Sequence, residues 1–247
     1  MAISFFKKIF SKEKEEISDR EKFEGAMCFA RQVASQNKED LYPIIRAFGK
    51  KIQYQRLADF IQIAGINGDY EEKIRLPDID QQSLWIDTHD ESFNRLYRDE
   101  FYSIIVKCEG RKSFKTSLID DVVLPWPWRR VRLIQALKSI GDNREWGKWK
   151  YDQSNHDLCV WLPINIFFVH GGNHSLAAGI LKNEGTLESR SCFDMAQAYQ
   201  RIKTDGEYYY LLKDSEEVKL SKVRNLDFAI IYEIGRMLLW ECTEFCV

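Results

Sequence analysis

The stretch VWLPINIFFVHGGNHSLAAGILKNEG, residues 160–185, constrains the fold of this chain more than any other. Its first ten residues are rich in β-branched and aromatic side chains and carry no charge, which predicts a buried strand over 160–169. The pair Gly171–Gly172 interrupts the run, and small apolar residues then predict a helix that ends before Gly185. With residues 186–193 as the next strand, the order strand, turn, helix, strand predicts an α/β unit.

Helical patterns surround this unit. Apolar residues at helical spacing predict helices within 18–65, within 91–108 and over 226–245, and a β-rich run followed by a helix over 117–141. The sequence therefore predicts an α+β fold with a helical N-terminal region and a C-terminal helix. The expected boundaries are a mostly helical region over 1–112, a core over 113–205, and a strand and helix extension packed on the core over 206–247.

Composition excludes some classes of protein. The net charge of −2 argues against a wholly basic protein that coats nucleic acid, although it allows a local basic face. The six cysteines are scattered without a CxxC pair, and no apolar run is long enough to cross a bilayer, so we expect a cytoplasmic protein with reduced thiols. The first sixteen residues combine Ile3, Phe6 and Phe10 on one helical face with lysines, which predicts either a helix packed on its own protein or a segment that docks on a partner or membrane surface.

The glycine turn is the first candidate site. Glycine lets a ligand approach the main chain, and the N-terminus of a helix offers unpaired N–H groups and a partial positive charge, which together favour an anion such as phosphate. Asn173, His174 and Ser175 could add side-chain donors, and His174 could also transfer a proton near neutral pH. The alternative is a compact strand-to-helix turn in which Asn173 or Ser175 caps the helix.

The stretch GGNHSLAAG, residues 171–179, following an apolar strand resembles the second conserved box of the ParB/sulfiredoxin-like superfamily, in which a similar turn contacts nucleotide phosphates. The earlier stretch LIDDVVLPWPWRRVRLIQALKSIG, residues 118–141, is similar to the first box of that superfamily. The resemblance covers about residues 117–192 and implies a small α/β core that binds a nucleotide. It also implies membership of an uncharacterised bacterial family, with phage defence or a mobile element as a plausible context.

Two positions depart from the superfamily pattern. Asn173 stands where sulfiredoxin has its catalytic cysteine, so we do not expect sulfinic-acid reduction. Ser175 replaces the phosphate-holding arginine, and a hydroxyl cannot supply the charged bidentate fork of a guanidinium. No helix-turn-helix region is evident downstream.

A basic and aromatic segment precedes the glycine turn. Residues 126–151 contain four tryptophans and seven lysines or arginines against two acids, a combination that suits phosphates and bases. If Arg129, Arg130 and Arg132 face the turn, they could supply the positive charge that Ser175 does not. The alternative is structural, with the tryptophans as core anchors and solvated cations. The buried side of the helix is then expected to consist of Leu133, Ile134, Leu137 and Ile140.

Metal chemistry is a weaker hypothesis. His156, His170 and His174 lie within nineteen residues, near Cys159, but their spacing matches no standard zinc pattern. The pair Asp120 and Asp121 could bind Mg²⁺ together with a nucleotide, although adjacent acids at a strand edge are usually solvated.

These observations predict a protein that binds the phosphate of a nucleotide or nucleic acid at Gly171, Gly172, Asn173, His174 and Ser175, with Arg129 and Arg130. In a catalytic version His174 would position phosphate or transfer a proton, Asn173 would orient it, and an arginine would stabilise developing charge. The alternative from another class is a non-catalytic interaction or scaffold protein that keeps the fold without the chemistry.

Overall fold

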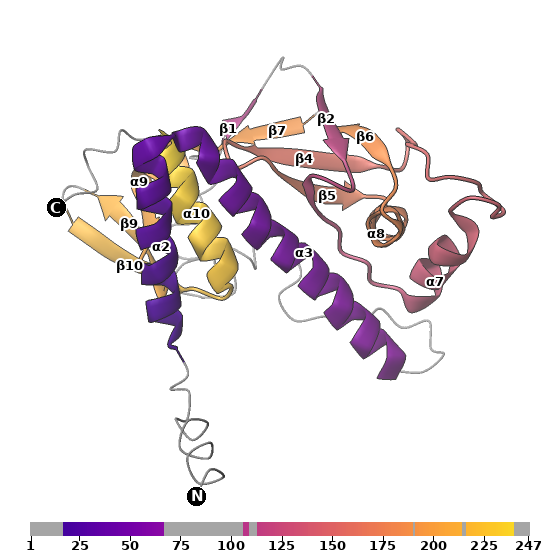
Figure 1. The fold of residues 1–247 in the computed structure, drawn as a ribbon, viewed down its shortest axis with the longest axis horizontal. Helices are drawn as coiled ribbons and strands as arrows, with labels where there is room; N and C mark the ends of the chain where they lie inside the picture. Colours follow the sequence, from indigo (N-terminus) through magenta and orange to yellow (C-terminus); the bar gives the residue numbers. More distant parts are fainter. Residues whose placement is uncertain (1–16, 67–105, 109–112, 190, 214–215, 240–247) are drawn as a thin grey trace, which may run out of the picture.

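The computed structural model describes residues 17–66, 106–108, 113–189, 191–213 and 216–239. The predictions for residues 1–16, for most of 91–108 and for the last residues of the C-terminal helix lie outside these ranges. The described part is a mixed α+β fold with helices at both ends, as the sequence predicts (Figure 1). None of the described helices is long and apolar enough to cross a membrane.

Two helices form the N-terminal part. Helix α2 (Asp19–Gln36) has Ser18 as its N-cap, and the side chain of Ser18 accepts from the backbone N–H of Glu21 in a capping box. A short 3₁₀ helix, η1 (Lys38–Asp40), leads into the long helix α3 (Leu41–Ile66). The helices expected within 18–65 are confirmed, and the second of them continues to Ile66.

The main sheet has five strands in the order β1-β7-β4-β5-β3. These are β1 (Val106–Lys107), β3 (Val122–Leu124), β4 (Asp157–Leu162), β5 (Ile166–Gly171) and β7 (Ser191–Asp194). Strand β3 is parallel to β5, β4 is antiparallel to β5 and parallel to β7, and β1 is antiparallel to β7. Strand β1 lies in the region expected to be mostly helical.

The single strand expected over 160–169 is in fact a hairpin. Strands β4 and β5 are joined by a tight turn at residues 163–165, where Asn165 adopts a left-handed conformation with φ of 54°. Pro163 and Asn165 both favour turns, but the residues around them are so apolar that the sequence predicted one continuous strand.

Both faces of the main sheet are covered. Alternate residues of its strands point to opposite sides, so Val122, Ile166 and Phe168 belong to one hydrophobic cluster and Val123, Phe167 and Val169 to another. The first cluster includes side chains of α2, α9 (Ala196–Arg201) and α10 (Leu226–Leu239). The second includes side chains of α7 (Arg130–Ser139) and α8 (Asn173–Lys182).

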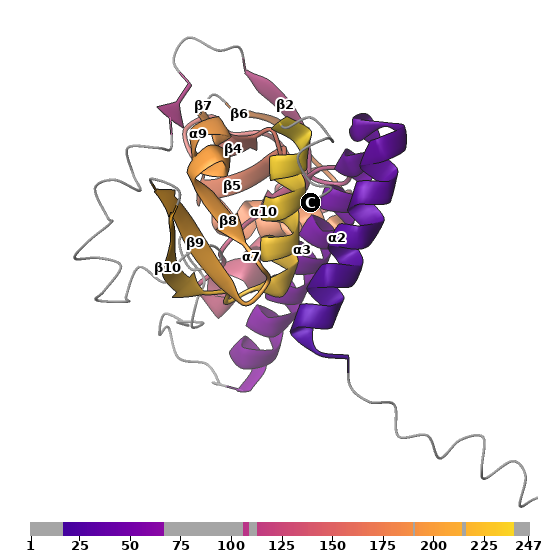
Figure 2. The ribbon, with the colours of Figure 1, turned by 90° about the vertical axis from the view of Figure 1, so that its left-hand side faces the viewer.

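Two smaller sheets complete the fold. Strands β2 (Phe114–Ser117) and β6 (Thr186–Ser189) form one antiparallel pair, and β8 (Ile202–Thr204), β9 (Tyr208–Lys213) and β10 (Glu216–Lys222) form the other sheet in the order β10-β9-β8. Helix α10 lies between this three-stranded sheet and helices α2 and α3 (Figure 2).

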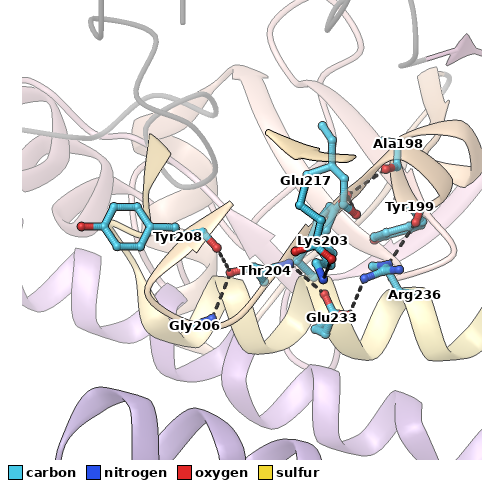
Figure 3. A network of polar contacts seen from close by, with 11 residues as sticks. Ala198, Tyr199, Lys203, Thr204, Gly206, Tyr208, Glu217, Glu233 and Arg236 are labelled. Carbon is cyan, nitrogen blue, oxygen red and sulfur yellow. Dashed lines mark hydrogen bonds and ion pairs between the residues drawn. The ribbon is translucent and has the colours of Figure 1, made fainter. Parts of the chain in front are cut away.

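Helix α10 carries a buried ion pair. The Oε1 atom of Glu233 accepts from Nη1 of Arg236 at 2.6 Å, and its Oε2 atom accepts from the backbone N–H of Thr204 at 3.2 Å. The Nε atom of Arg236 donates to the carbonyl oxygen of Tyr199 at 3.0 Å (Figure 3). Burial raises the pKa of Glu233, and the guanidinium opposes that shift. The network ties α10 to α9 and β8.

Candidate anion-binding site

Helices α7 and α8 begin at the same edge of the main sheet. Strands β3 and β5 run parallel, with Leu124 opposite Phe168; β5 is followed at once by α8, and β3 leads through a short loop into α7. Their N-termini therefore lie side by side at the carboxyl ends of two neighbouring parallel strands (Figure 1). In open α/β sheets this is the edge at which ligands usually bind.

The loop between β3 and α7 is bonded to the first turn of α8. Asn173 accepts from the backbone N–H of Trp126 through Oδ1, at 2.5 Å. The Nε2 atom of His174 accepts from the backbone N–H groups of Trp128 and Arg129, at 3.3 and 3.1 Å. Both side chains are buried. Asn173 and His174, which the sequence indicated as site residues, therefore hold the N-termini of α7 and α8 together.

The protonation of His174 follows from these contacts. A backbone N–H can only donate, so Nε2 is the acceptor and the ring proton of the neutral side chain lies on Nδ1. Burial, with Arg132 and Arg129 nearby, lowers the pKa of His174 to about 4. A neutral ring whose acceptor nitrogen is already bonded is poorly suited to proton transfer near pH 7. The catalytic roles expected for His174 and Asn173 remain untested, and these contacts count against them.

Ser175 bonds a second histidine. The Nδ1 atom of His156 accepts from the backbone N–H of Asp152 at 3.0 Å, so its Nε2 atom carries the proton and donates to Oγ of Ser175 at 2.6 Å. The serine hydroxyl in turn donates to the carbonyl oxygen of Gly172 at 3.0 Å. Although a histidine and a serine are in contact, this tautomer cannot take the proton of the hydroxyl as a nucleophile's base would.

The glycine pair is closely approached by the chain itself. Gly172 is the N-cap of α8 and is left-handed, with φ of 75°. A Cβ atom at Gly171 would lie 2.7 Å from the carbonyl oxygen of Asn155, and one at Gly172 would overlap the ring of His156. On this side the absence of side chains makes room for residues 155–156, which agrees with a compact turn. The expected cap by Asn173 or Ser175 is wrong, because the N-cap is Gly172 and no side-chain cap is formed.

The open side of the site is the first turn of α7. Arg129 is its N-cap, and Arg130 and Arg132 follow in its first turn without an acidic residue. The side chain of Arg129 makes no capping hydrogen bond, although the backbone N–H of Arg129 is bonded to Nε2 of His174. The Nε atom of Arg129 is buried and has no hydrogen-bond partner among the described residues. Positively charged side chains repel the positive end of a helix dipole, so a bound anion would be favourable at this turn.

The sequence did not predict that Arg56 lies beside this site. Its guanidinium lies 4.0 Å from the ring centroid of Trp126, although Arg56 is on α3, seventy positions earlier in the chain. Nothing in the local sequence of α3 signals this cation–π contact, because only the packing of α3 against β3 creates it.

The acidic pair lies elsewhere. Asp121 directly precedes β3, at the opposite end of that strand from the loop that leads to α7. Its Oδ2 atom accepts from the backbone N–H of Ser117 at 2.7 Å, and Oδ2 of Asp120 accepts from Oγ of the same serine at 2.9 Å. These carboxylates close a turn and are not placed to share Mg²⁺ with a phosphate beside α7 and α8.

A shared metal site is not formed by the histidines either. His170 is exposed, whereas His156 and His174 are buried and bonded as described above. Across the described ranges, no three His, Cys, Asp or Glu side chains are grouped so that they could hold a metal ion.

The comparisons with known proteins identify a family but no activity. A family model described as a family of unknown function, DUF6710, matches residues 7–244, which is nearly the whole chain. The chain belongs to this family. No curated protein and no solved structure matches it. The comparisons show no link to the ParB/sulfiredoxin-like superfamily, so that resemblance stays a hypothesis.

Proposed function

We propose that this protein binds a phosphate-bearing ligand, a nucleotide or a nucleic acid, at the paired N-termini of α7 and α8. The supporting observation is the first turn of α7, where Arg129, Arg130 and Arg132 gather at the positive end of the helix and no acidic residue accompanies them. A bound phosphate would accept hydrogen bonds from main-chain N–H groups and guanidinium groups together.

In this proposal the side chains of Asn173 and His174 do not contact the ligand, whereas the sequence predicted that they do. Since Asn173 and His174 are bonded to the loop over 126–129, their task is to fix the position of Arg129 relative to α8. The phosphate contacts then fall to the arginines and the main chain. Binding without turnover agrees with a His174 that is neutral at pH 7.

A non-catalytic interaction protein is the second candidate function. It is favoured by the same contacts, because the polar side chains of the glycine turn are engaged in holding the fold. The two candidates differ in whether a small phosphate compound binds at all.

Calorimetric titration with inorganic pyrophosphate and with nucleoside triphosphates tests the proposal. We expect Arg132→Gln to weaken binding about tenfold, as loss of one charge-assisted hydrogen bond predicts. Lys138→Gln removes the same charge from the other end of α7 and should change affinity less than about twofold, because the helix field is confined to its terminal turn. Absence of binding, or equal losses in the two variants, would contradict the proposal.

A further inference from the structure

The outer face of α7 is exposed and mixed in character. Leu133, Ala136 and Ile140 are buried against the second cluster, whereas Val131 and Ile134 are 55% and 51% exposed. The exposed side chains of this face are Val131, Arg132, Ile134, Gln135 and Lys138. The expectation that Ile134 is buried is therefore wrong. Figure 1 shows α7 at the periphery of the described part of the chain.

Positive charge is concentrated on and after this helix. Residues 129–150 contain seven lysines or arginines against two acids, although the whole chain has a net charge of −2. Arginines lie at the first turn of α7, and Lys138 lies at the last. The Nη1 atom of Arg144 donates to the carbonyl oxygen of Lys138 at 3.3 Å, so a further cation lies at that end. Such a surface is complementary to a polyanion.

The spacing of the charges indicates the form of the polyanion. Ten helical residues extend about 15 Å, which is close to the roughly 12 Å width of the major groove of B-DNA. Cations at the two ends of α7 could therefore contact phosphates on both sides of the groove. Between them, the Nε2 atom of exposed Gln135 donates to Oγ of Ser139 at 3.0 Å, so its Oε1 atom could accept from a base edge, and exposed Ile134 could contact a thymine methyl group. The major groove of A-form RNA is too narrow for such a helix.

We infer that the outer face of α7 binds double-stranded DNA in the major groove. This inference rests on the proposed function, because the phosphate site at the start of α7 supplies contacts on one side of the groove. The inference adds a second group of phosphate contacts, from Lys138 and Arg144, which a free nucleotide or pyrophosphate does not need.

Fluorescence anisotropy with a labelled duplex of about 20 base pairs tests the inference. We expect the full chain to bind duplex DNA at least about tenfold more tightly than the matching single strand or an RNA duplex. We also expect affinity to fall at least about tenfold between 50 and 200 mM salt, since several phosphates are neutralised. Exposed Trp146 could stack on an unpaired base, so equal or tighter binding of the single strand would overturn the inference.

Charge-matched variants locate the surface. The double variant Lys138→Gln with Arg144→Gln should weaken duplex binding at least about tenfold and reduce the slope of log affinity against log salt by about 2. Lys213→Gln with Lys222→Gln removes two exposed lysines from the three-stranded sheet and should leave both values unchanged. Equal effects of the two double variants would mean that only total charge matters, and would overturn the inference.

Pyrophosphate binding separates this inference from the proposed function. Lys138→Gln with Arg144→Gln should bind pyrophosphate as the unmodified chain does. If the unmodified chain binds pyrophosphate but not the duplex, the DNA inference fails and the proposed function stands. If it binds neither, both fail.

Discussion

Gln53 of α3 donates a hydrogen bond from Nε2 to the carbonyl oxygen of Val123, at 2.6 Å. Val123 belongs to β3, the last strand of the main sheet, and Gln53 is buried. A side-chain amide thus provides one of the hydrogen bonds that a neighbouring strand would otherwise make, which is one way in which proteins protect a sheet edge.

Gln53→Leu should lower the free energy of unfolding by about 1–3 kcal/mol, because the carbonyl oxygen of Val123 loses its buried donor. Urea denaturation measures the change. Gln62→Leu, on the exposed side of the same helix, is the control and should have little effect. Similar losses in both variants would mean that the hydrogen bond to β3 is unimportant.

Gly172→Ala should destabilise the protein by at least about 2 kcal/mol. The substitution strains a left-handed backbone and forces a Cβ atom into the ring of His156. Gly25→Ala is the matched control, because a Cβ atom at Gly25 in α2 meets no atom within 4 Å. The free energy of unfolding of that variant should rise by up to about 1 kcal/mol, because alanine has a higher helix propensity than glycine. A tolerated alanine at Gly172 would show that residues 155–156 do not pack on the turn.

Stability should fall on acidification from pH 6.5 toward pH 4, in part because of His174. Its pKa is lowered to about 4 in the folded protein, so the unfolded chain binds more protons in this range and is favoured as the pH falls. His174→Gln keeps an acceptor near the position of Nε2 and cannot be protonated, so its stability should depend less on pH. Unfolding midpoints measured across this range give the result. His170→Gln, at an exposed position, is the matched control and should change the unfolding midpoint at pH 6.5 very little.

Arg236→Met should cost about 3–5 kcal/mol at pH 7, because Glu233 is left buried without its cation. The pKa of Glu233 would rise further, so the folded variant would bind more protons than the unfolded chain and the loss should be smaller at pH 5. Lys203→Met breaks the more exposed ion pair with Glu217 and should cost at most about 1 kcal/mol (Figure 3). Chemical denaturation of both variants at the two pH values makes the comparison.

Local pattern was sufficient to predict most helices and the order of elements around the glycine turn. The helices within 18–65, the helix that starts after Gly172 and the apolar helix that begins near Leu226 all depend on residues close in sequence. The hairpin of β4 and β5 was missed because buried strands and a short turn between them share one apolar run.

The candidate site was only partly predictable. The sequence indicated a strand-to-helix turn and a basic segment, and the structure brings Arg129 and His174 together. The sequence could not show that His174 faces main-chain N–H donors, because that contact depends on the pairing of β3 with β5. Likewise, the sequence predicted that Ile134 is on the buried side of α7, whereas it is exposed. In a ten-residue helix with apolar residues on several faces, the sequence does not show which face packs.

Helix α3 passes from one side of the main sheet to the other. Leu41, Ile45 and Ile52 in its first half belong to the first hydrophobic cluster, whereas Leu57, Phe60 and Ala64 belong to the second. If either cluster unfolded, half of α3 would lose its packing contacts. The other half would then be less stable, and the second cluster would be destabilised with it. The protein should consequently lose its native structure in a single cooperative step, with calorimetric and van't Hoff enthalpies that agree.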